Sequence, residues 1–135
     1  MNMADLPAKP NPTHSELAGP YWDGVAAGHL LLQTCTSCGT VRHYPRLLCA
    51  RCYAEGVEWK SASGRGRIHS WTVAHHAFHP AFVGDLPYTL VTVDLEEGPR
   101  ALGRWQGGTP MIGQPVLGKF VAREAGHDLV FAPVE

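Results

Sequence analysis

The stretch CTSCGTVRHYPRLLCARC, from Cys35 to Cys52, contains all four cysteines of the 135-residue chain. They form two C-x-x-C pairs separated by ten residues, a spacing typical of four-cysteine zinc ribbons. Two residues between ligands allow one tight turn to direct both sulfurs at a single ion. Gly39 gives the first turn its backbone freedom, whereas Tyr53 takes the equivalent place after the second pair, so we expect a less regular second turn.

Four thiolates complete a tetrahedron and leave no open position for water or substrate, so this pattern favours a structural ion over a catalytic one. Zinc is the expected metal, although iron also suits a tetrahedral sulfur site. Free or oxidised cysteines without metal are the remaining alternative. The predicted metal ligands are Cys35, Cys38, Cys49 and Cys52.

Charge and hydropathy limit the classes of function. Charged residues make up 17% of the chain, below the roughly 25% of an average soluble domain, which indicates a polar-poor surface that meets a partner. The formal net charge of -1 gives no overall attraction to phosphate backbones. We see neither a signal peptide nor an apolar run of about 18 residues, so we expect a cytoplasmic protein without a membrane span. In that reducing compartment, paired cysteines are expected as thiolate ligands.

The residues before the cysteines predict short helices after a proline-containing tail. Thr13-His14-Ser15-Glu16 has the T-x-x-E form of a capping box, which predicts a short helix from Thr13. Gly19 and Pro20 end it, and Pro20 is then suited to begin a second helix over residues 20–30. Gly28 is the expected cap of that second helix.

After the cysteines the pattern changes to short strands separated by Gly, Pro and Asp turn signals. Five strands in about 70 residues fit a small closed barrel of the OB type better than a two-sheet sandwich. The predicted fold class is therefore mainly β, with N-terminal short helices, a zinc ribbon and a C-terminal five-stranded OB-fold barrel. The predicted strands lie within 66–78, 88–98, 100–105, 115–123 and 129–134.

From Tyr21 onward the chain resembles the DUF35 family, in which a rubredoxin-like zinc ribbon precedes an OB-fold domain. The resemblance is carried by GHLLLQTCTSCGTVRHYPRLLCARC, WKSASGRGRIHSWT, LPYTLVTVDLEEGPRALG and the closing FAPV. It implies a small acyl-CoA-associated protein that accompanies a thiolase-like or hydratase-like enzyme, with acyl-CoA binding in the helix and barrel region, and it implies no catalytic residue. We therefore expect a tail with helices over 1–29, the ribbon over 30–60 and the barrel over 61–135.

Two groups of residues are candidates for holding an acyl-CoA. The basic group, in and before SGRGR, suits the nucleotide end of CoA, although a turn into the first barrel strand explains the glycines equally well. The aromatic group suits the pantetheine arm, with a core or partner-interface role as the alternative. The candidate ligand-binding residues are Lys60, Arg65 and Arg67 in the first group and Tyr21, Trp22, Phe82 and Tyr88 in the second.

Candidate catalytic residues are harder to find. His75, His76 and His79 suggest a second metal or acid–base site, but strand alternation sends the first two to opposite faces, and exposed histidines at a strand end are the simpler interpretation. No serine lies in a G-x-S-x-G elbow, so no nucleophile is assigned.

Three functions remain as hypotheses. The favoured one is a non-catalytic acyl-CoA-binding or scaffold subunit that assembles with a thiolase-like or hydratase-like enzyme and has no independent activity. The alternative is a module for single-stranded nucleic acid, because zinc ribbons and OB barrels also serve that purpose. A third is an independent enzyme that uses the histidines.

Overall fold

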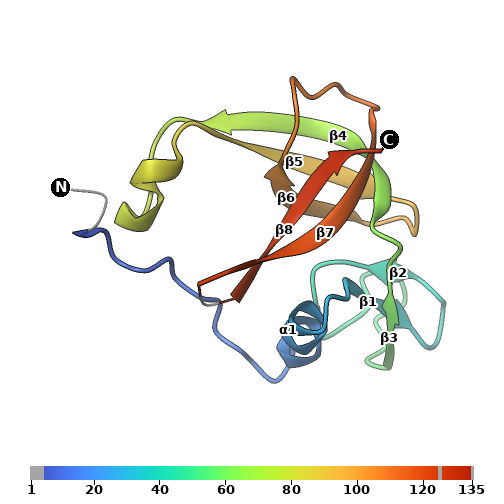
Figure 1. Cartoon of the computed structure of the whole chain (residues 1–135). Coiled ribbons are helices and arrows are strands. Elements are labelled where there is room, and N and C mark those ends of the chain that lie inside the picture. Colours follow the sequence, from blue (N-terminus) through green and yellow to red (C-terminus); the bar gives the residue numbers. More distant parts are fainter. Residues whose placement is uncertain (1–4, 125, 135) are drawn as a thin grey trace.

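A three-stranded sheet and a closed five-stranded barrel form the chain in the computed structural model, which describes residues 5–124 and 126–134 (Figure 1). One α-helix lies beside the small sheet, and the N-terminal segment runs from the far side of the barrel to that helix. The mainly β architecture predicted from the sequence is confirmed, including the number of barrel strands.

The small sheet carries the first cysteine. Its central strand β1 (Leu31–Cys35) pairs antiparallel with β2 (Val41–Arg42) on one side and β3 (Val57–Ser61) on the other. Leu32 and Gln33 on β1 are almost completely buried. Because β1 ends at Cys35, the sheet fixes the position of the first knuckle.

The barrel strands follow in the order β4-β5-β6-β8-β7, and β7 pairs back with β4 to close the ring. All neighbouring strands are antiparallel except β6 and β8, which pair in parallel at Arg104–Val130 and Trp105–Phe131. A bulge shifts the register of β4 between Ile68 and Ser70. The strands are β4 (Arg65–Ala74), β5 (Tyr88–Leu95), β6 (Arg100–Trp105), β7 (Pro115–Arg123) and β8 (Gly126–Pro133), and the 3-10 helix η2 (Pro80–Asp85) lies between β4 and β5.

Phe131 fills the centre of the barrel and is fully buried. Its ring lies against two glycines, Gly103 on β6 and Gly118 on β7, where an added Cβ would come within 2.6 Å of ring atoms. These glycines leave room for the ring in a closed barrel whose interior is filled by side chains.

The helix α1 (Gly19–Ala26) begins one residue before Pro20 and buries Tyr21, Gly24 and Val25. Its end is marked by Gly28, whose φ of 84° is the left-handed conformation expected of a helix cap. Gly24 allows close packing on β1, because a Cβ there would lie 2.7 Å from the Leu31 side chain.

The helix predicted from the capping box at Thr13 is wrong. Residues 16–18 form a turn, in which the Ser15 hydroxyl accepts a hydrogen bond from the Ala18 N–H at 3.0 Å. The Ser15 carbonyl also accepts from the Gly19 N–H at 2.7 Å. Ser15 therefore satisfies the backbone groups at the entrance to α1, and the T-x-x-E pattern has no helix to cap.

One buried cluster joins the helix, the small sheet and the barrel. Val25 of α1 and Leu32 of β1 belong to the same cluster as Ile68, Val91 and Phe131 of the barrel. The ribbon and helix are thus packed on the barrel through a continuous core. In the described part of the chain, no helix has the length and apolarity needed to cross a membrane.

Candidate functional site

The four cysteine sulfurs converge at one point, all within 4.8 Å of one another. The Sγ atoms of Cys35 and Cys52 are 3.5 Å apart, and those of Cys38 and Cys49 are 3.6 Å apart. Four sulfurs at the zinc–thiolate bond length of about 2.3 Å would be separated by about 3.8 Å in a regular tetrahedron. The donor set and its spacing therefore fit a tetrahedral metal ion.

The two cysteine turns have the same hydrogen bonds. Gly39 donates to the Cys35 carbonyl at 2.9 Å, and Tyr53 donates to the Cys49 carbonyl at 2.8 Å. Both residues have a left-handed backbone, with φ of 78° and 63°. The irregular second turn expected from Tyr53 is wrong, because tyrosine adopts the conformation that glycine provides in the first turn.

Backbone N–H groups in these turns hydrogen-bond to the cysteine sulfurs and favour the thiolate form that binds a cation. Those of Cys38 and Ser37 hydrogen-bond to the Cys35 sulfur, and they lower the pKa of that thiol. The N–H groups of Cys52 and Arg51 do the same for the Cys49 sulfur. For Cys52 the Ala54 N–H lowers the pKa, but the neighbouring thiols outweigh it and raise the value to about 11. A bound cation would relieve this repulsion among the sulfurs.

A buried polar contact ties the second turn to the first strand. The Gln33 Oε1 atom accepts hydrogen bonds from Arg42 Nε and from the backbone N–H of Arg46, both at 2.8 Å. Arg46 lies on the loop that leads to Cys49, so Gln33 holds this loop against the strand that ends at Cys35.

His43 connects the ribbon to the helix, since its ring lies 5.3 Å from that of Tyr21. Burial lowers the pKa of His43 to about 4 and, as the larger of two causes, raises that of Tyr21 to about 12. The imidazole is therefore neutral at pH 7 and packs as a flat, mostly apolar group.

We expect this histidine to make folding sensitive to mild acid. The unfolded side chain takes up a proton below about pH 6.5, whereas the folded one stays neutral down to about pH 4, so stability is lost as the pH falls between these values. Urea unfolding at pH 7.5 and 5.5 should show a loss of about 1 kcal/mol that His43→Phe abolishes. Equal losses in both proteins, with metal content unchanged, would contradict this.

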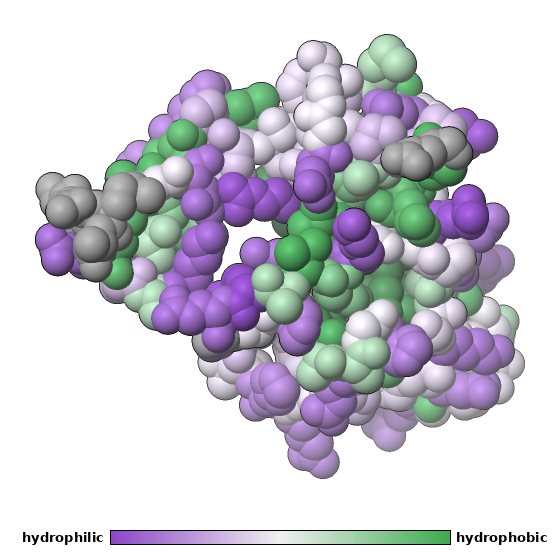
Figure 2. Space-filling model, in the orientation of Figure 1, coloured by the Kyte–Doolittle hydropathy of each residue, from purple (hydrophilic) through white to green (hydrophobic). Residues whose placement is uncertain are grey.

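A second site lies where α1, η2 and the barrel border a cavity of about 410 Å³. Four of the seven candidate ligand-binding residues line it: Tyr21 and Trp22 from α1, Phe82 from η2 and Tyr88 from β5. Leu90, Leu102, Phe120 and Leu129 complete its apolar wall. Figure 2 shows a hollow on this face, with green apolar residues along one side and purple hydrophilic residues along the other. We call this cavity the aromatic groove.

Cations gather at the edge of the aromatic groove and lie on its rings. The Arg104 guanidinium is 4.7 Å from the centre of the Tyr88 ring, and the Lys9 ammonium is 5.4 Å from that of Phe82. Both cations also pair with Asp85, at 3.0 Å and 2.7 Å. Hydrogen bonds from Lys9 and Arg104 lower the pKa of Asp85, so its carboxylate stays ionised.

The basic candidates lie elsewhere. Arg65 and Arg67 line a different cavity, which the acidic residues Asp94 and Glu96 also line. Lys60 on β3 is exposed and lies 3.9 Å from Glu58. The structure therefore brings the aromatic candidates together but separates them from the basic ones.

The histidine candidates do not form a site with one another. His79 caps η2, where its Nδ1 accepts a hydrogen bond from the Ala81 N–H at 3.1 Å. His75 and His76 follow the end of β4, and the ring of His76 lies against Phe78. Among the described residues, the four cysteines are the one cluster of potential metal ligands.

Several groove residues were not found from the sequence. Tyr44 lies on the ribbon loop, and no sequence pattern marks it as a groove residue. Its hydroxyl accepts a hydrogen bond from the Leu102 N–H of the barrel at 3.0 Å. Arg104 on β6 and Arg123 on β7 are distant in sequence from the α1 residues that they face across the groove. An alternation analysis could have placed them on one barrel face, but not opposite α1.

Comparison with known proteins agrees with both halves of the structure. Residues 22–58 match the model described as "ChsH2, rubredoxin-like zinc ribbon domain", and residues 59–121 match "ChsH2, C-terminal OB-fold domain". A solved structure described as "Ltp2-ChsH2(DUF35) aldolase" superimposes with a TM-score of 0.81 at 31% identity, covering 91% of this chain and 98% of that one.

Two curated relatives are longer proteins. A "Probable enoyl-CoA hydratase alpha subunit" of Thermomonospora curvata is 33% identical over 112 residues, which is 81% of this chain and 34% of the relative. A "3-oxo-4,17-pregnadiene-20-carboxyl-CoA hydratase alpha subunit" of Mycobacterium tuberculosis is 34% identical over 121 residues, or 87% and 38%. This chain thus spans little more than a third of each relative.

The family assignment rests on three findings: the four-cysteine ribbon, the closed barrel that follows it, and the matches to family models across both. The chain belongs to the DUF35 family, as a ChsH2-type rubredoxin-like zinc ribbon joined to an OB-fold domain.

Proposed function

We propose that this chain is a non-catalytic subunit that binds acyl-CoA, or scaffolds its binding, within a thiolase-like or hydratase-like enzyme complex in the cytoplasm. The observation that carries the proposal is the aromatic groove, an apolar cavity of about 410 Å³ with cations at its edge. Such a cavity suits a pantetheine arm or acyl group, because apolar walls with a few polar groups are typical of small-molecule sites.

The names of the relatives support the same assignment. Two are described as hydratase alpha subunits and one as part of an aldolase, and the hydratase names contain CoA. The metal centre, which we propose to hold zinc, would stabilise the ribbon at one wall of the groove. Its four sulfurs leave no position for substrate.

Asp128, which lines the groove, and Asp85, at its edge, are engaged in ion pairs. Asp85 pairs with Lys9 and Arg104, and Asp128 accepts a hydrogen bond from Arg123 Nε at 3.0 Å. These ion pairs fix the positions of Arg104 and Arg123, both of which line the groove. Binding of the CoA nucleotide at Lys60, Arg65 and Arg67 remains a separate prediction, because these residues lie outside the aromatic groove. The acidic Asp94 and Glu96 line the same cavity as the two arginines and disfavour a phosphate there.

Replacing Trp22 by alanine is expected to weaken binding of octanoyl-CoA about tenfold, because the indole forms part of the groove wall. Isothermal titration of the chain, alone and with its enzyme partner, would measure the change. Trp71→Ala is the matched control, since Trp71 lies on the outside of β4 and lines a different cavity.

A single-stranded oligonucleotide should be titrated in parallel to test the alternative function. We expect weak binding that falls steeply with added salt, as counterion release predicts. Tight, salt-resistant oligonucleotide binding without any response to acyl-CoA would overturn the proposal in favour of a nucleic-acid module.

A further inference from the structure

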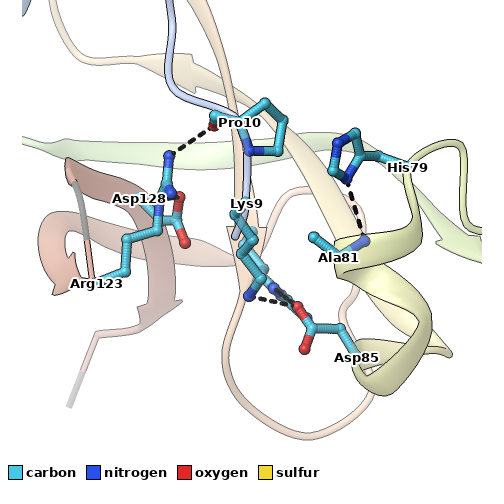
Figure 3. A network of polar contacts seen from close by, with 8 residues as sticks. Lys9, Pro10, His79, Ala81, Asp85, Arg123 and Asp128 are labelled. Atoms are coloured by element: carbon cyan, nitrogen blue, oxygen red, sulfur yellow. Dashed lines mark hydrogen bonds and ion pairs between the residues drawn. The ribbon is translucent and has the colours of Figure 1, made fainter. Parts of the chain in front are cut away.

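The N-terminal segment Leu6–His14, which we call the strap, crosses the mouth of the aromatic groove. In Figure 1 it runs from beside η2 to the start of α1. Figure 3 shows its two polar attachments, the Lys9–Asp85 ion pair at 2.7 Å and a hydrogen bond from Arg123 Nη2 to the Pro10 carbonyl at 3.2 Å. Both attachments are made by side chains of residues at the edge of the groove.

The strap has few other bonds to the rest of the molecule. Within the described residues, no hydrogen bond between backbone groups joins residues 6–14 to the barrel or the helix. Three of its residues are prolines, which have no N–H to donate. Its remaining contacts are side-chain packing, such as the His14 ring stacked at 6.4 Å from Trp22. A segment held in this way can separate without disturbing the fold.

Three cavities lie along the strap, and strap residues line all of them. Besides the aromatic groove, which Pro12 lines, a cavity of about 270 Å³ lies beside Leu6–Lys9, and another of about 270 Å³ lies beside Asn11–His14. Arg123 borders all three. The strap therefore divides one longer depression, which extends from η2 along the end of β7 to α1.

Lys9 and Arg104 lie over two of the rings that line the groove. Lys9 lies over Phe82 and Arg104 over Tyr88, and the shared Asp85 carboxylate holds both cations in place. An apolar group that packs on the side of Phe82 covered by Lys9 has to displace the Lys9 ammonium, which is the main polar attachment of the strap.

We propose that the strap is an autoinhibitory closure, which lies in the path of an apolar ligand and is released when the Lys9–Asp85 ion pair opens. This inference rests on the proposed function for the identity of the ligand, an acyl-CoA, but the closure itself concerns any apolar occupant. Because coupling is reciprocal, ligand binding should loosen the strap as much as loosening the strap favours ligand binding.

Charge changes at Lys9 test the closure, since this residue lies on the strap and outside the lining of the aromatic groove. The full chain should be compared with Lys9→Gln and Lys9→Glu. Lys119→Gln and Lys119→Glu are matched controls, because Lys119 is exposed on β7. Three measurements apply: the heteronuclear ¹⁵N NOE of the Ala8, Asn11 and Thr13 amides, the affinity for the uncharged dye Nile red, and the affinity for octanoyl-CoA.

We expect Lys9→Glu to lower the NOE of the strap amides and to tighten binding of both ligands about fivefold, with a smaller change for Lys9→Gln and none for the controls. A strap that stays rigid in Lys9→Glu would overturn the inference. So would a strap that becomes mobile while both affinities stay unchanged or weaken.

The two proposals fail in different ways. If octanoyl-CoA binds to none of the variants but Nile red binds more tightly to Lys9→Glu, the closure stands and the acyl-CoA function falls. If octanoyl-CoA binds to all variants with one affinity, the function stands and the closure falls.

Discussion

Replacing Cys49 by serine is expected to remove the metal and unfold the ribbon, with soluble protein falling well below half of the unmodified yield. Apparent free energies of zinc binding in small structural sites are about 10–16 kcal/mol, as large as the whole stability of a typical domain. Cys49 is completely buried, and its sulfur lies 3.6 Å from that of Cys38. A hydroxyl in its place leaves three thiolates that cannot complete the tetrahedron.

Elemental analysis and amide NMR spectra measure this prediction. Less than about 0.2 equivalents of metal should remain in Cys49→Ser, and the amide signals of β1 and β2 should collapse. Ser37→Ala is the control within the same cluster, because it keeps the N–H that faces the Cys35 sulfur. Full metal content and an unchanged melting temperature in Cys49→Ser would show that the site does not stabilise the fold.

Replacing Phe131 by alanine is expected to cost about 3–5 kcal/mol, the range for removing a large aromatic side chain from a core. The ring is fully buried, and Gly103 and Gly118 beside it have no side chains that could fill the space. The barrel is closed, so its strands cannot move together to collapse the cavity without breaking pairs.

Urea unfolding would measure the loss for Phe131, with Phe78→Ala as the matched control. The Phe78 side chain is 90% exposed, so its removal should change stability by less than about 0.5 kcal/mol. Losses of similar size at the two positions would mean that the barrel centre is not the core of this domain.

The metal centre and the barrel could be predicted from the sequence because their signals are local. Two C-x-x-C pairs act through turns of a few residues, and each barrel strand alternates or runs apolar within its own length. The helix expected at Thr13 failed for the opposite reason. The T-x-x-E pattern is short and common, and in the structure the Ser15 hydroxyl accepts a hydrogen bond from Ala18 in a turn instead.

The groove could be predicted only in part, because its walls come from distant elements. The aromatic residues could be chosen by their chemistry, but their proximity depends on how α1 and η2 pack on the barrel. The environment of Arg67 could not be predicted from the sequence either. Its position opposite Asp94 depends on the strand register, which shifts at the bulge between Ile68 and Ser70.

A crystal structure with octanoyl-CoA bound would test the central claim most directly, because it locates the ligand. We predict that the acyl or pantetheine portion lies in the aromatic groove against Trp22, Phe82 and Tyr88, with the strap displaced from Lys9 onward. A ligand bound only at Arg65 and Arg67, with the groove empty, would contradict the account.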